Sequence, residues 1–445
     1  MSNPHYFIET FGCQMNVADS ELIAGMLQEC GYSETRDMTQ ADIIFMNTCA
    51  IREKAEETVH HRLDSIQHLK KRKPEMIFGV LGCMAQNLKN DLLESKPYVD
   101  VILGPDSYRR IPEIINNRKK QIGHEVDTRL SKYEVYDNLM PSRQDGVNAY
   151  VSISRGCDKF CTFCIVPFTR GRERSRSNES IIREVKDAVN NGFAEITLLG
   201  QNVNSYRTEK GKFPHLLEAV ALLPGVDRIR YMSPHPQDMD DHLLQVMSEH
   251  ENICNYVHLP LQAGSDHILK RMNRTYTKTE FLKLVDSIRE YIPDCSISTD
   301  IIVGFPGETN AEYEETLEVM NKVIFDRAFM FKYSSRPGTK AAEYTDQIDE
   351  DIKQERLARL IELQQSHTLI ANKRHIGKVL KVMVEKESKK SPQQWSGRTE
   401  GNMGVVFDKN DEQIKDIVNI LIHDAQGVSM FGNRVLEKEM IHEIN

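Results

Sequence analysis

Short apolar runs alternate with amphipathic stretches along the first third of the chain. Four runs predict strands at residues 6–13, 42–49, 77–83 and 99–105, and helical patterns at 22–27, 52–71 and 88–93 follow the first three. Strands that alternate with helices build a parallel sheet with crossover helices. The polar stretch 119–143 lacks clear periodicity, and it predicts a linker after this first domain.

The same alternation resumes at Val147 on a larger scale. Helical patterns such as 179–190 and 277–291 separate six apolar runs that predict strands, at 149–154, 195–200, 228–233, 256–261, 297–304 and 328–333. Six such units predict an open, partial barrel, because a complete barrel of this kind has eight.

The last part of the chain follows a third pattern. A charged helix is predicted at 350–373, and short alternating strands with glycine-containing turns follow from His375. Such strands are typical of a small β-barrel. The predicted fold class is therefore α/β, with a parallel-sheet domain at 1–140, a partial (β/α)6 barrel at 143–372 and a small β-barrel at 373–440.

Composition narrows the classes of function. The chain has 445 residues, of which 40% are hydrophobic and 28% charged, and this favours a soluble globular protein of several domains. Neither a signal-peptide pattern nor an apolar run of membrane-spanning length is present, so we expect the cytoplasm and no membrane partner. The net charge of -9 argues against a generally cationic nucleic-acid binder.

Nine cysteines in such a chain indicate metal binding or catalysis more than a disulfide framework. Cys13, Cys49 and Cys83 each close a predicted strand, and the carboxyl ends of parallel strands share one edge of a sheet. We therefore expect these three to converge, although cysteine is also a common core residue. For Cys30, Cys254 and Cys295 the core is the expected place.

A second group of cysteines is much tighter. Cys157, Cys161 and Cys164 lie in the polar stretch GCDKFCTFC after the first predicted barrel strand. Three thiolates so close in sequence favour an iron–sulfur cluster. A structural zinc ion would need a fourth ligand, and no histidine lies between Gly156 and Arg176.

The CxxxCxxC spacing of CDKFCTFC resembles that of radical S-adenosylmethionine enzymes. In that superfamily the three cysteines hold a [4Fe–4S] cluster, and S-adenosylmethionine binds its fourth iron. LLGQNV and DIIVGFPGE resemble the segments that contact S-adenosylmethionine there. The resemblance implies cofactor contacts at six residues, namely Gly200, Gln201, Ser233, Gln262, Ile302 and Gly304.

The whole chain resembles the methylthiotransferase family of these enzymes, including its C-terminal TRAM module. TFGCQMN, NTCAIREKAE, LGCMAQ, RGCDKFCTFCIVPFTRGRERSR, HLPLQAGSD and FKYSSRPGT carry the resemblance. It implies a transferase with two [4Fe–4S] clusters, the second held by Cys13, Cys49 and Cys83, and with S-adenosylmethionine as both radical source and methyl donor. The expected reaction is insertion of a methylthio group at carbon 2 of N6-dimethylallyladenosine, next to the anticodon of a tRNA. The expected partners are the tRNA anticodon stem-loop, a flavodoxin-type electron donor and the iron–sulfur assembly machinery.

The segment TRGRERSR places Arg170, Arg172, Arg174 and Arg176 at every second position, so in an extended chain they would share one face. Contacts to RNA phosphates are one interpretation, and a solvated loop or an ion-pair network is the other. Phe160, Phe163 and Phe168 could stack on a base, although packing around the cysteine loop is the simpler expectation.

Other functions remain open on sequence alone. Related methylthiotransferases act on N6-threonylcarbamoyladenosine in tRNA or on an aspartate of a ribosomal protein. Outside enzymes, the cysteines would also suit an iron–sulfur electron carrier or a zinc-stabilised RNA-binding protein.

Overall fold

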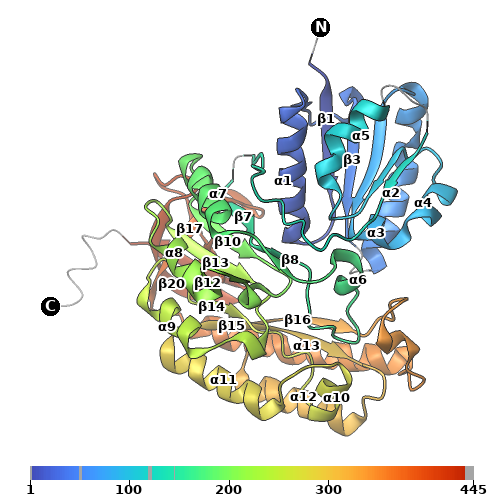
Figure 1. Cartoon of the computed structure of the whole chain (residues 1–445). Coiled ribbons are helices and arrows are strands. Elements are labelled where there is room, and N and C mark those ends of the chain that lie inside the picture. The colour runs from blue at the N-terminus through green and yellow to red at the C-terminus, as the bar shows by residue number, and fades with distance from the viewer. Residues whose placement is uncertain (1–2, 50–52, 119–122, 145, 436–445) are drawn as a thin grey trace.

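The computed structural model describes residues 3–49, 53–118, 123–144 and 146–435. The predicted helix start at Arg52 and the last predicted residues of the C-terminal domain, 436–440, lie outside these ranges. The predicted fold class is confirmed: a parallel sheet, a partial barrel and a closed β-barrel follow one another along the chain (Figure 1).

The N-terminal part is a six-stranded parallel sheet between two layers of helices. Its strands lie in the order β2-β1-β3-β4-β5-β6. One face packs on α1 and α5, and the other packs on α2, α3 and α4, so both faces are buried. The strands are β1 (His5–Thr10), β2 (Ser33–Glu34), β3 (Ile43–Thr48), β4 (Ile77–Gly82), β5 (Val101–Leu103) and β6 (Glu125–Asp127). The helices are α1 (Gln14–Glu29), α2 (Glu53–Arg72), α3 (Cys83–Leu88), α4 (Asn90–Ser95) and α5 (Ile111–Arg118), with 3-10 turns at Met38–Gln40 and Tyr108–Arg110.

The stretch 119–143, predicted as a linker, is only partly one. Its strand β6 extends the sheet by pairing with β5, and Tyr136 is buried between the N-terminal domain and Arg155 of the barrel. The strand was missed because β6 is three residues long and two of them are charged. A parallel edge strand of this length produces no readable periodicity.

The middle part forms the partial barrel from two three-stranded parallel sheets. A β-bridge between Ile229 and Ile253 links the two sheets. The core of the partial barrel is a large apolar cluster between its strands and helices. The strands are β7 (Asn148–Ser152), β10 (Glu195–Leu199), β13 (Arg228–Met232), β14 (Tyr256–His258), β15 (Ser296–Val303) and β16 (Arg327–Lys332). The covering helices are α7 (Asn178–Asn190), α8 (Phe213–Ala221), α9 (Asp241–Glu249), α10 (Asp266–Arg271), α11 (Lys278–Tyr291) and α12 (Asn310–Val323).

Shorter elements fill the connections of the barrel. They are β8 (Ser154–Arg155), α6 (Val166–Arg170), β9 (Arg174–Ser175), β11 (Arg207–Thr208), β12 (Gly211–Lys212) and 3-10 turns at Val203–Ser205, Pro236–Asp238 and Lys340–Glu343. Serine, threonine or aspartate caps begin several helices; Thr277 at α11, for example, forms a reciprocal capping box with Glu280.

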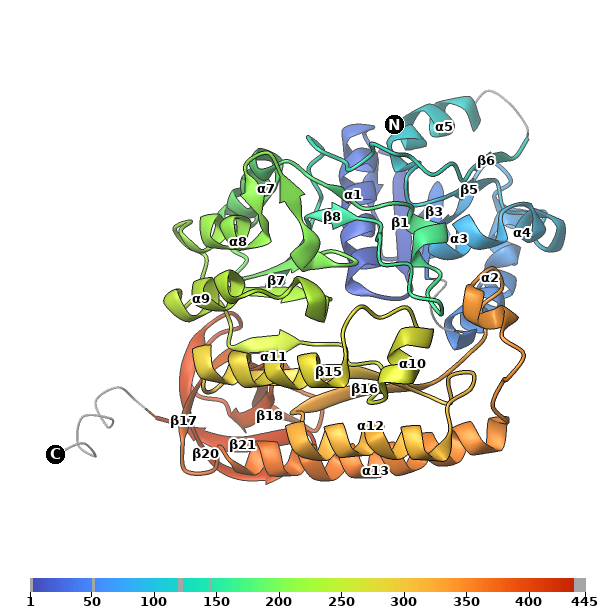
Figure 2. The same cartoon turned by 60° about the horizontal axis from the view of Figure 1, so that its bottom comes forward.

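A long helix, α13 (Glu350–Lys373), leads to the closed C-terminal barrel. Its strand order is β17-β18-β19-β21-β20, and β20 pairs back with β17 (Figure 2). The strands are β17 (Val379–Ser388), β18 (Ser391–Thr399), β19 (Gly404–Asp408), β20 (Ile417–Gln426) and β21 (Ser429–Arg434). Closure leaves this small sheet without an open edge. In the part of the chain that the structure describes, every helix is too short or too polar to cross a bilayer.

The C-terminal barrel docks on the amino ends of the middle strands through buried arginines. Arg230 donates to the carbonyl oxygens of Thr399 (2.8 Å) and Glu400 (2.7 Å), and its Nε lies 2.9 Å from the carboxylate of Glu195. Arg398 of the C-terminal barrel lies 3.1 Å from the same carboxylate. The two barrels are therefore joined by charge-assisted hydrogen bonds in which Arg230 and Glu195 are buried.

Replacing Arg230 with leucine should lower the free energy of unfolding by about 3–5 kcal/mol, because it removes a buried partner of Glu195 and leaves two carbonyls unpaired. Urea unfolding followed by circular dichroism measures this. Arg359→Leu is the matched control, since Arg359 pairs with Glu314 where both side chains are exposed, and its effect should stay below about 1 kcal/mol. Equal effects of the two substitutions would contradict the docking role of Arg230.

Candidate functional site

The structure brings Cys13, Cys49 and Cys83 together at the carboxyl edge of the N-terminal sheet. Cys49 follows β3 directly, Cys83 begins α3 after β4, and Cys13 precedes α1 after β1. These three strands are neighbours in the sheet. Gly12 has a φ of +123°, and a Cβ there would overlap Cys49, so glycine is what allows the two strand ends to approach.

The electrostatic environments of these thiols differ. A hydrogen bond with Cys49, helped by the positive charge of Arg170, lowers the pKa of Cys13 to about 6. Burial raises the pKa of Cys83, although Arg170 opposes this rise. A thiolate is the form of cysteine that binds metals, and a cation beside the three thiols favours that form.

Arg170 reaches this trio from the barrel. Its Nε donates to Sγ of Cys83 at 3.2 Å, and its Nη2 donates to Asn16 at 3.3 Å and to Asp19 at 3.0 Å. Burial opposes the charge of this guanidinium, but Cys83 and Asp19 hold its pKa well above the usual value. Arg170 therefore remains a cation although it is fully enclosed.

The same Asp19 carboxylate accepts a hydrogen bond from Arg155, and its side chain is only 1% exposed. Two arginines of the barrel thus converge on one aspartate of α1. A small apolar cluster lies beside them, in which Cys13 and Met15 pack against Leu199 at the end of β10. The N-terminal trio is thereby held against the carboxyl ends of the barrel strands.

The expectation that four alternating arginines form one RNA-facing surface is wrong for three of them. Arg170, Arg174 and Arg176 are buried, because the chain turns through α6 and β9 and is not extended. Arg174 lies 2.8 Å from Asp106 and Arg176 lies 2.6 Å from Glu184. The ion-pair alternative therefore holds here, with one carboxylate of the N-terminal domain and one of α7 as partners.

Only Arg172 of the four is exposed, and it pairs with Asp158 at 2.6 Å and 3.1 Å. Asp158 lies in the loop of the tight cysteine trio, and Arg172 follows α6, which comes directly after that loop. Contact of Arg172 with RNA stays a prediction.

Cys157, Cys161 and Cys164 lie in the loop between β8 and α6. Asn273 donates to the carbonyls of Lys159 and Phe160, both at 3.0 Å, and fixes the middle of this loop. Gly156 begins the loop with a φ of +77°, and a Cβ there would overlap the carbonyl oxygen of Arg172. The loop is therefore held at its start by the backbone near Gly171 and Arg172, where the Cys157 amide donates to the Gly171 carbonyl at 3.2 Å, and in its middle by the side chain of Asn273.

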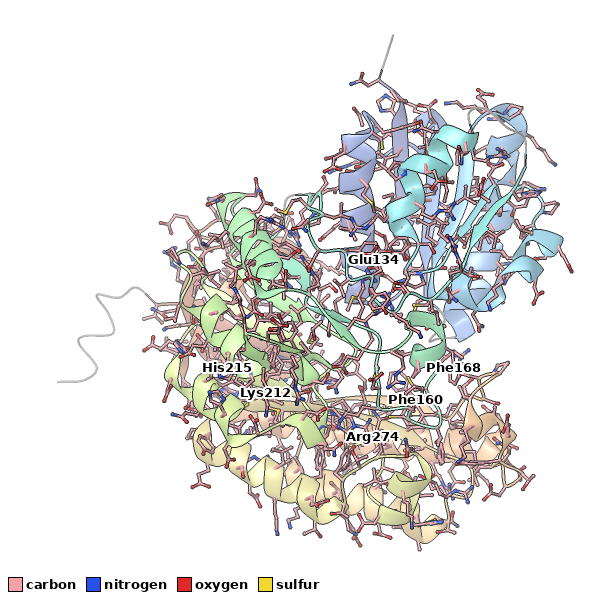
Figure 3. The ribbon with its side chains drawn as sticks, in the orientation of Figure 1. Glu134, Phe160, Phe168, Lys212, His215 and Arg274 are labelled. Atoms are coloured by element: carbon pink, nitrogen blue, oxygen red, sulfur yellow. The ribbon has the colours of Figure 1, made fainter. Side chains whose placement is uncertain are left out.

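Burial raises the pKa of Cys157 to about 11 and that of Cys164 to about 12. Cys161 accepts a hydrogen bond from Arg274 at 3.4 Å, and Arg274 is held in turn by Pro260 and Tyr276 (Figure 3). A positively charged partner for the thiolates thus exists at this trio as well.

The six residues expected to contact S-adenosylmethionine lie at or beyond the carboxyl ends of β10, β13, β14 and β15: Gly200, Gln201, Ser233, Gln262, Ile302 and Gly304. Gln201 Oε1 accepts a hydrogen bond from the Gly156 amide at 2.5 Å, which ties this edge to the cysteine loop. Among the described residues, the buried oxygens Ser154 Oγ, Asn202 Oδ1 and Gln262 Oε1 lack a hydrogen-bond partner. Unpaired buried polar atoms at one edge suit a polar ligand.

The donor sets at both trios fit iron–sulfur ligation, since each offers three unbridged thiols beside an arginine. Within the described ranges, no three His, Cys, Asp or Glu side chains converge closely enough to share one metal ion. That geometry concerns a single ion. In a [4Fe–4S] cluster each thiolate binds a different iron, and the ligands stand farther apart.

The other three cysteines differ in their burial. Cys254 and Cys295 are buried, as expected for core residues. Cys30 is exposed at the end of α1, so its expected core position is wrong. A residue that caps a helix lies outside the apolar stripe, and this explains the exposure.

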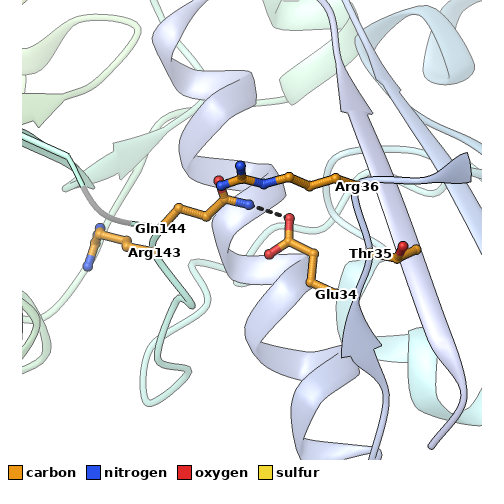
Figure 4. A pocket seen from close by; sticks show the side chains of 5 residues that line it. All are labelled: Glu34, Thr35, Arg36, Arg143 and Gln144. Atoms are coloured by element: carbon orange, nitrogen blue, oxygen red, sulfur yellow. Dashed lines mark hydrogen bonds between the residues drawn. The ribbon is translucent and has the colours of Figure 1, made fainter. Parts of the chain in front are cut away.

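A cavity of about 450 Å³ lies beside β2, and no cysteine is among the described residues that line it (Figure 4). Gln144 donates to Glu34 across it at 2.5 Å, and Arg36 and Arg143 complete its wall with Thr35. It contains none of the expected site residues.

The sequence patterns did not predict a role in the site for Asn16, Asp19, Arg155 or Arg274. A signal for the first two was present, because Asn16 and Asp19 lie on the same face of α1 as the buried Ile23. Polar residues on the apolar stripe of a helix indicate a buried polar contact. Arg155 and Arg274 carry no comparable pattern.

Replacing Asp19 with asparagine should lower the free energy of unfolding by about 3–5 kcal/mol, because Arg155 and Arg170 would lose their shared buried carboxylate. Urea unfolding of the metal-free protein measures this. Glu314→Gln, which affects the exposed pair with Arg359, should change it by less than about 1 kcal/mol. A loss at Asp19 no greater than at Glu314 would exclude the network as a major contributor.

In metal-free protein at pH 7, iodoacetamide should label Cys13 much faster than Cys164. A pKa near 6 leaves about nine-tenths of a thiol ionised at that pH, whereas one near 12 leaves roughly 1 part in 100,000. Peptide mass spectrometry measures both rates. Iron loading should protect the two trios, whereas the exposed Cys30 should react equally in both forms. Unchanged labelling of Cys13 after loading would contradict its role as a ligand.

Comparison with known proteins adds three family matches. Residues 5–104 match the Uncharacterized protein family UPF0004, residues 151–320 match the Radical SAM superfamily, and residues 373–435 match the TRAM domain. Among solved structures, the radical S-adenosylmethionine methyltransferase TsrM from Kitasatospora setae, with cobalamin and a [4Fe-4S] cluster bound, has a TM-score of 0.59 at 14% identity and covers 77% of each chain. This likeness concerns the fold.

Curated relatives are much more similar. Proteins named tRNA-2-methylthio-N(6)-dimethylallyladenosine synthase are 48% identical in Bacteroides fragilis (97% of this chain, 96% of the relative) and 45% identical in Christiangramia forsetii (96% and 93%). The relative of that name from Porphyromonas gingivalis is 47% identical over 96% of this chain and 94% of its own.

Proposed function

Because the chain belongs to the family of tRNA-2-methylthio-N6-dimethylallyladenosine synthases, we propose that its two cysteine trios work as a pair at one tRNA base. The protein is a radical S-adenosylmethionine transferase, and its substrate is N6-dimethylallyladenosine in tRNA. The observation that carries the proposal is 45–48% identity over nearly the whole chain, together with two cysteine trios joined by one short segment: α6 begins two residues after Cys164 and ends at Arg170, which donates to Cys83.

The tight trio, Cys157, Cys161 and Cys164, is the proposed holder of the [4Fe–4S] cluster that binds S-adenosylmethionine. Cys13, Cys49 and Cys83 are the proposed holders of a second [4Fe–4S] cluster, which handles sulfur. When bound, these groups supply radical chemistry at an unactivated carbon and the sulfur and methyl group of the product.

The side chains of this chain supply position and charge. Arg274 and Arg170 face one trio each and offset the negative charge of the thiolates. Gln201 links the cysteine loop to the expected S-adenosylmethionine contacts, and the buried oxygens of Ser154, Asn202 and Gln262 would orient the polar groups of that ligand. The Asp19 network fixes the separation of the two trios.

The finer partners are proposals as well. We place the target base in the anticodon loop, beside the anticodon, and expect a flavodoxin-type reductant and the iron–sulfur assembly machinery as protein partners. A tRNA substrate fits a cytoplasmic protein. The residue boundaries 1–140, 143–372 and 373–440 remain our proposed domain limits.

Reconstituted protein with S-adenosylmethionine and reductant should convert prenylated tRNA to its 2-methylthio form, as measured by nucleoside mass spectrometry. Cys161→Ala should abolish both this product and 5′-deoxyadenosine. Cys49→Ala should abolish the product but retain 5′-deoxyadenosine, because the tight trio is intact. Matched tRNAs without the prenyl group or with N6-threonylcarbamoyladenosine are the substrate controls. Methylthiolation by Cys49→Ala would contradict the role of the N-terminal trio, and a preference for threonylcarbamoyl tRNA would contradict the substrate.

A further inference from the structure

The exposed aromatic ring of Phe168 lies on the short helix that connects the two cysteine trios. We propose that the target adenine stacks on this ring while its carbon 2 faces both trios. This inference rests on the proposed function and adds a residue that holds the base.

The burial of α6 singles out this ring. Of its five residues, Pro167, Thr169 and Arg170 are buried and Val166 is half-buried, whereas Phe168 is 52% exposed. A large apolar side chain on an otherwise buried helix does not serve that helix's own packing. Its exposed face is available to a ligand.

The place of α6 gives the ring a functional context. The helix begins two residues after Cys164 and ends at Arg170, whose guanidinium contacts Cys83. It lies beside α3, which begins with Cys83 (Figure 1). Phe168 is therefore carried by the segment that spans from one trio to the other.

Phe168 can be compared with the other exposed phenylalanines. Within the described residues, the exposed phenylalanines are Phe160, Phe168, Phe329 and Phe331. Phe160 belongs to the cysteine loop, and the other pair belongs to β16, the last strand of the partial barrel. None of them lies on a helix that covers the outside of the barrel. In Figure 3, the labelled Phe160 and Phe168 lie near each other, between the N-terminal domain and the lower half of the barrel.

Phe168 is a better stacking surface than Phe160. The guanidinium of Arg172 lies 5.4 Å from the ring centre of Phe160, so one face of that ring has a partner already. His258 lies similarly against Phe329, with ring centres 5.7 Å apart. For Phe168 the structure gives no ring or cation contact among the described residues, and half of its surface is open.

The chemistry of the substrate fits this ring. A base that is modified inside an RNA loop must leave its stack, and proteins hold such bases on aromatic side chains. A ring parallel to the base leaves the edge with carbon 2 free to face the thiol sites. It also tolerates the apolar prenyl group better than a charged substituent.

The test uses cluster-loaded protein, an anticodon stem-loop with the prenylated target adenine, and a matched stem-loop that lacks the base at that position. Phe168→Leu should bind the prenylated stem-loop roughly 5- to 150-fold more weakly than the wild type, the equivalent of ~1–3 kcal/mol per stacked base. The two proteins should bind the stem-loop without the base equally well. Phe168→Trp should bind the prenylated stem-loop like the wild type, because it keeps an aromatic face.

Four controls separate stacking from misfolding. Phe168→Leu should keep the iron content, the absorbance spectrum of the clusters and the RNA-independent formation of 5′-deoxyadenosine. Tyr133→Leu, which removes an exposed ring in the 123–144 connection, should bind the prenylated stem-loop like the wild type.

Wild-type affinity of Phe168→Leu for the prenylated stem-loop, equal losses in Phe168→Leu and Phe168→Trp, or an equal loss on the stem-loop without the base would overturn the inference. In each case, methylthiolation of prenylated tRNA by the wild type would leave the proposed function standing. Failure of the wild type to make that product would instead refute the proposed function, and the inference with it.

Discussion

The arrangement of the molecule depends on one buried carboxylate. Asp19 of α1 accepts hydrogen bonds from Arg155 and Arg170, and all three are removed from water at the contact between the N-terminal domain and the barrel. A charge in such a place is costly unless it is paired, so any sliding of one domain on the other would separate charges without solvent to replace them. Two domains joined in this way keep one relative position. A fixed relative position is what the proposal of two sites that act on one base requires.

The main features of this fold follow from local patterns in the sequence. The six barrel strands lie within one or two residues of their predicted starts, because alternation of apolar strands with amphipathic helices is a strong signal over long segments. The convergence of Cys13, Cys49 and Cys83 also follows from a rule, since each closes a parallel strand. The edge strands β2 and β6 were not predicted, because strands of two or three residues are too short to show an alternation of apolar and polar positions.

The segment from Arg170 to Arg176 shows why a prediction of side-chain exposure from local sequence fails at a contact between domains. Alternation of Arg170, Arg172, Arg174 and Arg176 predicts one exposed face only if the chain is extended. A helical turn ends at Arg170, and the partners Asp19, Asp106 and Glu184 lie far apart in sequence. Whether an arginine is buried depends on carboxylates that only the folded chain brings near it. Sequence spacing contains no information on that distance.

The segment from Cys164 to Arg176 therefore serves both sites at once. It begins as the end of the tight trio, continues as α6, and supplies Arg170 to the other trio and Arg174 to Asp106. A cation that stabilises the N-terminal thiolates is thus encoded in the barrel and not in the domain that holds those thiolates. The N-terminal domain alone would gather three cysteines at its sheet edge but would lack this charge. Its site is electrostatically complete only after the barrel has docked, so the geometry that aligns the two sites also completes one of them.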